Sequence, residues 1–331
     1  MLRDTLGQSK PVIGTVHLMP LPGSAKWQGQ LGPVIERAEQ EAMALASAGV
    51  HALLLENTFD APFPQQHIDT AGAIAMAQIA HHIQHLTPLP LGITVYQNNP
   101  EAALAVALNV GASFIRVPVM VGTMITEAGM IAGRLHELCA YRDKLKLPPD
   151  AVRIFADIST HHVVPAPSMQ SPWRSPDAYL LRVAQAIAKH NVAHGLIVSQ
   201  AELPPEAIAT LNEALVLPIL VGDTFTPETI GAYHAAANGI LLGSGIQKAL
   251  PNARMASHEP FDHPAVDVIK VERLMHALQT GGLPAYSEVG RPPLGGYENN
   301  PMGKEMADIA MPPASCPFSQ GQVEREPLVS R

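Results

Sequence analysis

The sequence predicts an α/β protein folded as a (β/α)8 TIM barrel, followed by an irregular extension rich in proline and glycine. Three observations support this fold. Eight short apolar segments alternate with segments of helical periodicity, they are apolar on both faces, and polar residues gather where they end. An open doubly wound sheet would expose two edge strands, but these segments contain none of the lysine residues that protect such edges, and their prolines are limited to Pro90, Pro118 and Pro218.

The predicted strands are spread over residues 12–242. The fifth is the clearest, because its apolar run ends in Asp157 and a polar loop that carries His161 and His162. Parallel barrels place their chemistry at this end of the strands. The eight strands are predicted at Val12–Leu18, Ala52–Leu55, Leu89–Val95, Phe114–Val119, Val152–Ile158, Gly195–Val198, Pro218–Val221 and Gly239–Leu242.

The helices between the strands are predicted from periodicity and from their first residues. Residues 33–48 repeat apolar side chains at helical spacing and stop before Gly49, as is typical of a helix C-terminus. Residues 70–85 and 266–278 are also expected to be helical. Three more helices should begin with a capping side chain, a proline and an acid. These starts are Asn99-Pro100-Glu101, Ser175-Pro176-Asp177 and Thr226-Pro227-Glu228.

The domain organisation follows from these segments. An α/β barrel uses about 250 residues as one domain, so residues 1–280 are assigned to a single barrel. Residues 281–331 have little periodicity and many prolines and glycines. We therefore expect an irregular or partly disordered C-terminal tail.

Composition excludes several functions. The chain has 331 residues, 47% of them hydrophobic, and a net charge of −8 without any run of lysine or arginine. Nucleic-acid binding is therefore disfavoured, because phosphate backbones select for clustered cations. No apolar run approaches the roughly 20 residues that span a bilayer. With no secretory leader and two distant cysteines, Cys139 and Cys316, we expect a cytoplasmic protein with free thiols.

Candidate functional residues follow from the strand ends. A carboxylate or imidazole that follows an apolar strand is seldom buried without a partner or a role. We assign acid–base catalysis to Glu56, Asp157 and His162. The predicted substrate-binding residues are His17, Asn57, Asn98, Arg116, Ser199, Asp223, Gly243, Ser244 and Gly245.

Several of these residues have a structural alternative. His17 lies between Val16 and Leu18, so it can equally be a core histidine with satisfied hydrogen bonds. Arg116 lies inside the fourth strand, where its guanidinium either pairs with one of the acids or binds an anionic substrate.

The glycine-rich turn after the eighth strand is a candidate phosphate site. Gly243, Ser244 and Gly245 leave room for backbone N–H groups to face an anion. The neighbouring loop would however place Asp223 beside that phosphate, which is costly unless a cation compensates. A ligand with a hydroxyl or amine group held by Asp223 is the alternative.

No cofactor is predicted. Imidazole and carboxylate groups suit a divalent metal ion, but they are dispersed and form no HxH or HExxH motif. The absence of a GxGxxG or P-loop sequence also disfavours nicotinamide and ATP chemistry.

Several motifs together resemble the BtpA/SgcQ family, from about Val12 to Leu278. They are Gly14–Ser24 with His17, the Glu56-Asn57 pair followed by Asp60 and Pro62-Phe63, Phe114-Ile115-Arg116-Val117, Gly122-Thr123-Met124 with Gly129 and Gly133, Tyr141-Arg142, Ala156-Asp157 and His162. The resemblance implies a barrel related in shape to phosphate-binding barrels. One branch of the family is associated with photosystem I biogenesis, which implies peripheral membrane association at most.

This chain departs from the family at three positions on the expected ligand rim. It has His161-His162 where the family tends to have Lys-His, and Gln200 where a glycine is usual. It has Gly222-Asp223-Thr224 in place of Gly-Ser-Gly. These differences predict a changed ligand or a relic site.

Two functions remain open from the sequence. The first is an enzyme that uses acid–base chemistry on a small polar metabolite of sugar or nucleoside type, with or without a phosphate, as an isomerase, lyase or hydrolase. The second is a non-catalytic assembly or stability factor of the photosystem I biogenesis type. The sequence is also compatible with a homo-oligomer.

Overall fold

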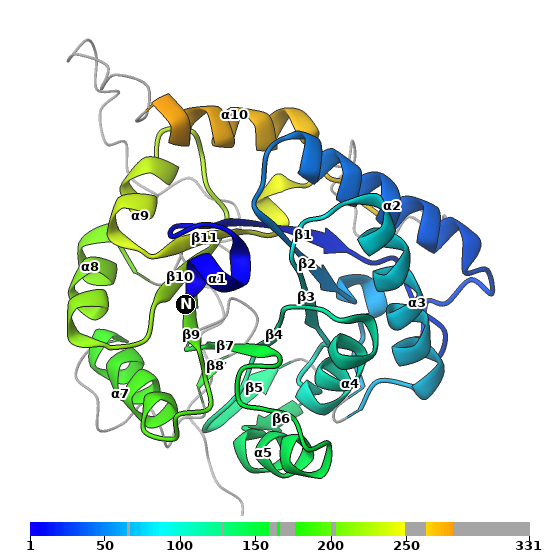
Figure 1. Cartoon of the computed structure of the whole chain (residues 1–331), viewed down its shortest axis with the longest axis horizontal. Helices are drawn as coiled ribbons and strands as arrows, with labels where there is room; N and C mark the ends of the chain where they lie inside the picture. Colours follow the sequence, from blue (N-terminus) through cyan, green and yellow to red (C-terminus); the bar gives the residue numbers. More distant parts are fainter. Residues whose placement is uncertain are drawn as a thin grey trace, which may run out of the picture. The chain divides into compact units, whose positions relative to one another are not determined.

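The computed structural model describes residues 1–64, 67–126, 129–158, 164–165, 176–199, 203–248 and 263–280. In this part of the chain eight parallel strands close into a barrel (Figure 1), which confirms the predicted TIM barrel. Around the barrel the strands follow the order β1 (Val12–His17), β11 (Gly239–Leu242), β10 (Ile219–Asp223), β9 (Gly195–Ser199), β7 (Arg153–Asp157), β4 (Phe114–Val117), β3 (Leu91–Thr94) and β2 (Ala52–Glu56).

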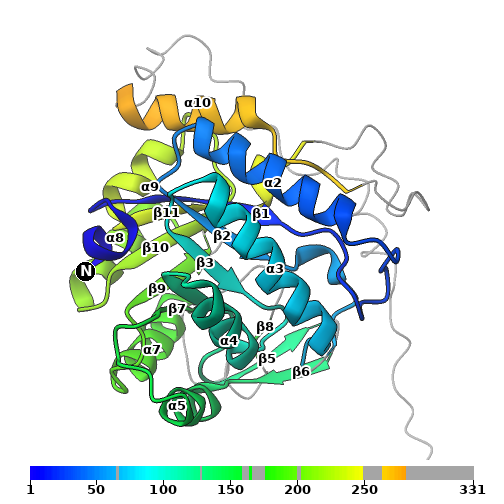
Figure 2. The ribbon, with the colours of Figure 1, turned by 45° about the vertical axis from the view of Figure 1, so that its right-hand side comes forward.

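Helices surround the strands. Figure 2 shows α2, α3 and α4 side by side along the outside of the barrel. No helix in the described ranges is both long and apolar enough to cross a membrane. The helices are α2 (Gly32–Ser47), α3 (Thr70–Leu86), α4 (Pro100–Val110), α5 (Leu135–Lys144), α7 (Pro176–Ala188), α8 (Pro205–Ala214), α9 (Ile230–Ala236) and α10 (Val268–Thr280).

The predicted helix starts have different outcomes. The Asn99 side chain caps α4 by accepting a hydrogen bond from the N–H of Ala102 at 3.1 Å, as predicted. The start predicted at Thr226 is wrong, because α9 begins at Ile230. The backbone N–H of Thr226 instead donates to the Thr229 hydroxyl at 3.0 Å, and residues 227–229 form a turn before the helix.

The barrel interior is a separate apolar core. Inward side chains from the strands, including Phe114 and Phe155 in an edge-to-face contact at 5.4 Å, fill its middle. Helix α1 (Leu2–Leu6) adds Leu2 and Leu6 to this core. The N-terminal helix therefore plugs one end of the barrel and leaves the other end for chemistry.

A second sheet was not predicted from the sequence. Strands β5 (Thr123–Thr126), β6 (Gly129–Ala132) and β8 (Val164–Pro165) pair antiparallel, and a small core of Val119, Met124 and Ile131 packs beside them. In the chain, β5 is the next strand after the barrel strand β4, and β8 is the next strand after the barrel strand β7. The sheet therefore builds up the same end of the barrel at which the polar residues gather.

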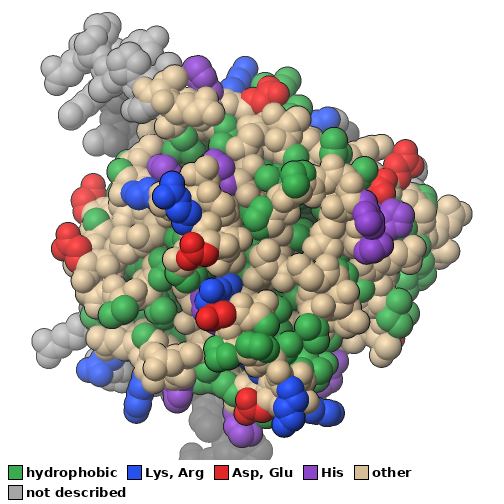
Figure 3. All heavy atoms as spheres, viewed as in Figure 1, with side chains coloured by type: hydrophobic (Ala, Val, Ile, Leu, Met, Phe, Trp, Pro, Cys, Tyr) green, Lys and Arg blue, Asp and Glu red, His purple; other side chains and the backbone are tan. Residues whose placement is uncertain are grey.

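Among the described residues, the face that carries α1 has no large patch of a single charge sign. Figure 3 shows acidic, basic and hydrophobic side chains interspersed on it. The predicted tail, residues 281–331, lies outside the described residues.

Candidate active site

The site arises from the alternation of side chains along the strands. Residues two apart on a strand point to the same face of the sheet. Two positions after a strand residue that lies in the apolar barrel interior, the next inward side chain therefore lies at the barrel mouth. In four strands the interior residue is hydrophobic and the next inward residue is polar. The four pairs are Leu54 and Glu56, Phe114 and Arg116, Phe155 and Asp157, and Ile197 and Ser199.

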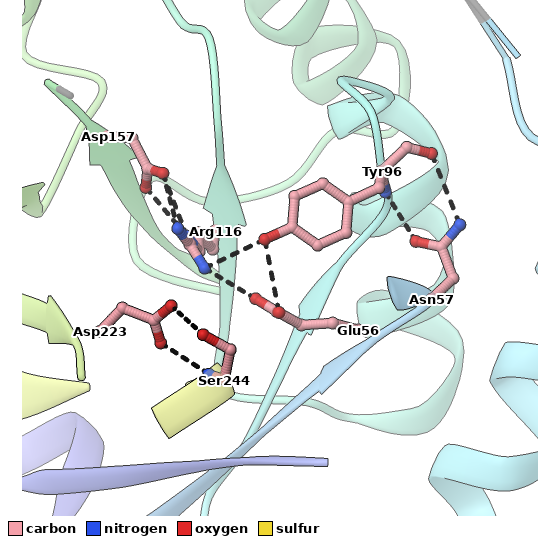
Figure 4. A network of polar contacts seen from close by, with 7 residues as sticks. All are labelled: Glu56, Asn57, Tyr96, Arg116, Asp157, Asp223 and Ser244. Atoms are coloured by element: carbon pink, nitrogen blue, oxygen red, sulfur yellow. Dashed lines mark hydrogen bonds and ion pairs between the residues drawn. The ribbon is translucent and has the colours of Figure 1, made fainter. Parts of the chain in front are cut away.

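Arg116 is held between two carboxylates (Figure 4). Its Nε donates to both carboxylate oxygens of Asp157 at 3.0 and 3.2 Å, and its Nη2 donates to Oδ2 at 2.8 Å. Its Nη1 donates to Oε1 of Glu56 at 2.8 Å. The exposed fractions of the side chains are 14% for Arg116, 5% for Glu56 and 0% for Asp157. The structural alternative foreseen for Arg116, ion pairing, is thus realised with both acids.

Tyr96 links this ion cluster to the loop after β2. Its hydroxyl accepts from Nη1 of Arg116 at 3.3 Å and donates to Oε2 of Glu56 at 3.4 Å. Its backbone N–H donates to Oδ1 of Asn57 at 2.7 Å, and Asn57 in turn donates to Asp60 at 2.9 Å. Asn57 therefore fixes the backbone that carries the tyrosine, as Figure 4 shows.

A pocket of about 60 Å³, open to solvent, lies over these residues. Glu56, Tyr96 and Arg116 form one part of its lining. His17, Thr58 and residues from the ends of β9, β10 and β11 form the rest. Asp157 is bonded to Arg116 but does not line the pocket. The polar lining side chains are His17, Glu56, Thr58, Tyr96, Arg116, Ser199, Asp223 and Ser244.

Burial shifts the pKa values of the groups around the pocket. Desolvation raises the pKa of Asp157 to about 6, although the Arg116 guanidinium acts in the opposite direction. Desolvation likewise raises the pKa of Glu56 against the influence of Arg116. The pKa of His17 is lowered by burial, so its imidazole is neutral at pH 7.

Asp223 and Ser244 close the opposite rim of the pocket. Ser244 donates its backbone N–H to Oδ1 of Asp223 and its hydroxyl to Oδ2, both at 2.8 Å. Asp223 ends β10, and Ser244 begins the short 3₁₀ helix η2 (Ser244–Ile246) after β11. The carboxylate thus joins two adjacent strand ends.

The described ranges contain no cluster of side chains that could bind a metal ion. Within them no three His, Cys, Asp or Glu side chains gather in a way that could hold a metal ion.

Comparison with known proteins identifies the family. The model of the BtpA family matches residues 8–279. The chain belongs to the BtpA family. It is 39% identical over 280 residues to photosystem I biogenesis protein BtpA of Synechocystis sp., covering 85% of this chain and 92% of that protein. The resemblance expected from the motifs is therefore confirmed.

The chain is also similar to an archaeal protein. An uncharacterized protein of Thermococcus kodakarensis is 33% identical over 241 residues, which cover 73% of this chain and 88% of the relative. Among solved structures, N-(5'-phosphoribosyl)anthranilate isomerase from Pyrococcus furiosus matches with a TM-score of 0.48 and 13% identity, covering 82% of this chain and 99% of that one.

The predicted site residues of this BtpA-family chain fall into three groups. His17, Glu56, Arg116, Ser199, Asp223, Gly243 and Ser244 line the pocket, with Asp157 bound to Arg116. Asn57, Asn98 and Gly245 contact protein instead: Asn98 bonds to Val119 and Ala132, and a Cβ at Gly245 would lie 2.8 Å from Thr224 Cα. His162 lies outside the described residues.

The residues near the site that were missed include Tyr96 and Glu41. Tyr96 directly follows the predicted third strand, so its place at a strand end was the available indication. Glu41 lies on α2, is 3% exposed, and accepts a hydrogen bond from the backbone N–H of His17 at 3.3 Å. It follows Val34 by seven residues on the apolar stripe of that helix, a position where an acid is unusual.

Proposed function

We propose that this BtpA-family barrel is an enzyme that transfers protons on a small polar metabolite bound over Glu56, Tyr96 and Arg116. The observation that carries the proposal is a desolvated arginine fixed by two buried carboxylates beneath a solvent-open pocket. Burying three charges is expensive. Charges directed into a barrel mouth would contribute nothing to adhesion through the outer surface.

Glu56 is the proposed general acid or base. It is the acid of the ion cluster that lines the pocket, and burial raises its pKa above the ordinary value of a glutamate carboxyl. A carboxyl with a raised pKa is a common proton-transfer group in active sites. The Tyr96 hydroxyl, bonded to both Glu56 and Arg116, would orient this carboxyl. His162 remains the predicted second acid–base group.

Arg116 and Asp157 have complementary proposed roles. Arg116 lines the pocket and would stabilise negative charge that develops on the substrate. Asp157 contacts the guanidinium at three donor–acceptor pairs and would act as a positioning residue. His17, neutral at pH 7, would accept or donate a hydrogen bond to substrate. Isomerisation, or cleavage of a C–C or glycosidic bond, is the reaction class that fits these groups.

The test is turnover with a matched pair of variants. Purified protein is incubated with a low-molecular-weight cell extract in deuterated water, and mass spectrometry records which metabolites are consumed or gain deuterium. We expect wild type to act on at least one, and Glu56→Gln to be slower by at least about 100-fold. Glu39→Gln, an acid 32% exposed on α2 and paired with His82, is the control and should retain full activity. No change in any metabolite, or equal rates for wild type and Glu56→Gln, would refute the proposal.

The second candidate is a biogenesis factor, favoured by the 39% identity to a protein named for photosystem I biogenesis. Under this hypothesis Glu56→Gln should complement a strain that lacks the gene as well as wild type does. Under the enzyme hypothesis the same variant should fail to complement.

A further inference from the structure

Asp223 occupies the position at which the rim between β10 and β11 would meet an anionic ligand. Its two carboxylate oxygens accept the backbone N–H and the hydroxyl of Ser244, each at 2.8 Å. Both donors lie in the pocket lining together with Asp223 itself. A phosphate oxygen that approached this part of the pocket would compete for donors that a carboxylate of the same chain already uses.

Gly243 allows the carboxylate to sit there. A Cβ atom built on Gly243 would lie 1.6 Å from Oδ1 of Asp223, which is far closer than two non-bonded atoms can approach. The missing side chain therefore accommodates Asp223, and it does not leave an open cradle for a ligand. From the sequence, this glycine suggested a phosphate site. In the structure, the glycine is needed because it leaves space for the Asp223 carboxylate.

The charges around the pocket point the same way. Of the described lining residues, Glu56 and Asp223 carry carboxylates, and the guanidinium of Arg116 is shared by Glu56 and Asp157. His17 adds no positive charge, and its Nδ1 atom is buried without a hydrogen-bond partner in the described part of the chain. A doubly charged phosphate would meet net negative charge, whereas a hydrogen-bond donor would meet acceptors.

We infer that the pocket takes an unphosphorylated small molecule whose hydroxyl or ammonium group donates to Asp223. This inference rests on the proposed function, because it names the ligand class of the same pocket. The Asp223 carboxylate takes the place that a phosphate group of the ligand would otherwise occupy. The same carboxylate accepts the hydrogen bond from the hydroxyl or ammonium group of the ligand.

Inorganic phosphate is the probe that tests the inference. Its binding is measured by isothermal titration to wild type, Asp223→Asn and Asp223→Ser, with Asp223→Ala as a second variant that empties the same space. Wild type and Asp223→Asn, which keeps the space filled, should bind phosphate only weakly. Asp223→Ser or Asp223→Ala should bind it at least about tenfold more tightly, a change equivalent to about 1.4 kcal/mol.

Two results would overturn the inference. One is phosphate binding by wild type or Asp223→Asn as tight as by the variants that empty the space. The other is no phosphate binding by folded Asp223→Ser or Asp223→Ala, since the Ser244 donors would then not form an anion site when released. Neither result depends on turnover, so failure here is distinguishable from failure of the proposed enzyme activity.

Discussion

Arg116 on β4 and Asp157 on β7 lie on adjacent strands and meet side-on, with Nε and Nη2 of the guanidinium directed at the two carboxylate oxygens. This geometry leaves Nη1 directed at Glu56 and Tyr96. Asp157 therefore sets the orientation in which the arginine serves the pocket. In the same arrangement, both Asp157 and Glu56 have the Arg116 guanidinium as their cationic partner.

Removing that cation should destabilise the fold. Arg116→Met leaves two buried carboxylates without their partner, and we expect the free energy of unfolding to fall by about 3–5 kcal/mol. Arg153→Met is the control: it also lies on a barrel strand, but its partner Asp150 is 68% exposed, so the loss should stay below about 1 kcal/mol. Urea denaturation at pH 7 measures both. Equal losses would show that the buried ion cluster contributes no special stability.

The raised pKa of Asp157 should appear in the pH dependence of stability. Because its pKa is about 6 in the folded protein and 3.8 as the ordinary value, the native state binds the extra proton between these limits. The free energy of unfolding from this group therefore decreases as pH rises from 4 to 6 and is constant above, by an amount on the order of 3 kcal/mol.

Asp157→Asn isolates this contribution, because it cannot titrate. The free energy of unfolding of wild type and of Asp157→Asn is measured by urea titration between pH 4 and 8. The difference between the two proteins should change across pH 4–6 and stay level above pH 6. Parallel curves for wild type and Asp157→Asn would mean that the carboxyl titrates at its ordinary pKa.

The Tyr96 hydroxyl should contribute modestly to stability. Tyr96→Phe removes its bonds to Glu56 and Arg116, and we expect the free energy of unfolding to fall by about 1 kcal/mol. Tyr179→Phe is a matched control, because the Tyr179 hydroxyl is buried and has no hydrogen-bond partner in the described ranges. Its loss should be neutral or slightly stabilising. The prediction fails if chemical denaturation shows the Tyr179 variant to be the less stable of the two.

Strands could be predicted from the sequence because each is a short apolar run that ends in polar residues. Glu56 was found in this way because it follows four apolar strand residues, and Arg116 because it is a charged residue inside the fourth strand. Their mutual contact could not be predicted, because it depends on barrel closure and on the register of strands far apart in the chain. Tyr96 was missed for the same reason: its hydroxyl reaches the ion cluster only through the path of the loop after β3.

The antiparallel sheet and the start of α9 show a second limit. Thr123–Thr126 has a threonine at each end and only two apolar residues between them, so no apolar run marks it as a strand in the sequence. At Thr226 a capping-type sequence is followed by a turn over residues 227–229, and the helix begins only at Ile230. Local sequence fixes which residues can cap, and the surrounding chain decides where the helix begins.

Asn98 gives the last prediction, because the structure shows its amide engaged with protein. Its Oδ1 accepts from the N–H of Val119 at 3.0 Å, and its Nδ2 donates to the carbonyl oxygens of Val119 at 2.9 Å and Ala132 at 3.1 Å. These bonds join the loop after β3 to the segment that leads into the antiparallel sheet. Asn98→Ala leaves buried backbone groups unpaired, so we expect the free energy of unfolding to fall by about 2–4 kcal/mol.

Asn98→Asp should cost at least as much, since a carboxylate would then face two carbonyl oxygens. Asn109→Ala is the control, because Asn109 is exposed and makes one bond, to Ala105 on its own helix, so its loss should stay within about 0.5 kcal/mol. Thermal and urea unfolding of the three variants measure these differences. If Asn98→Ala were as stable as wild type yet lost ligand binding, Asn98 would be a substrate-binding residue, as its place at a strand end suggested. Equal destabilisation by the Asn98 and Asn109 variants would contradict the structural role.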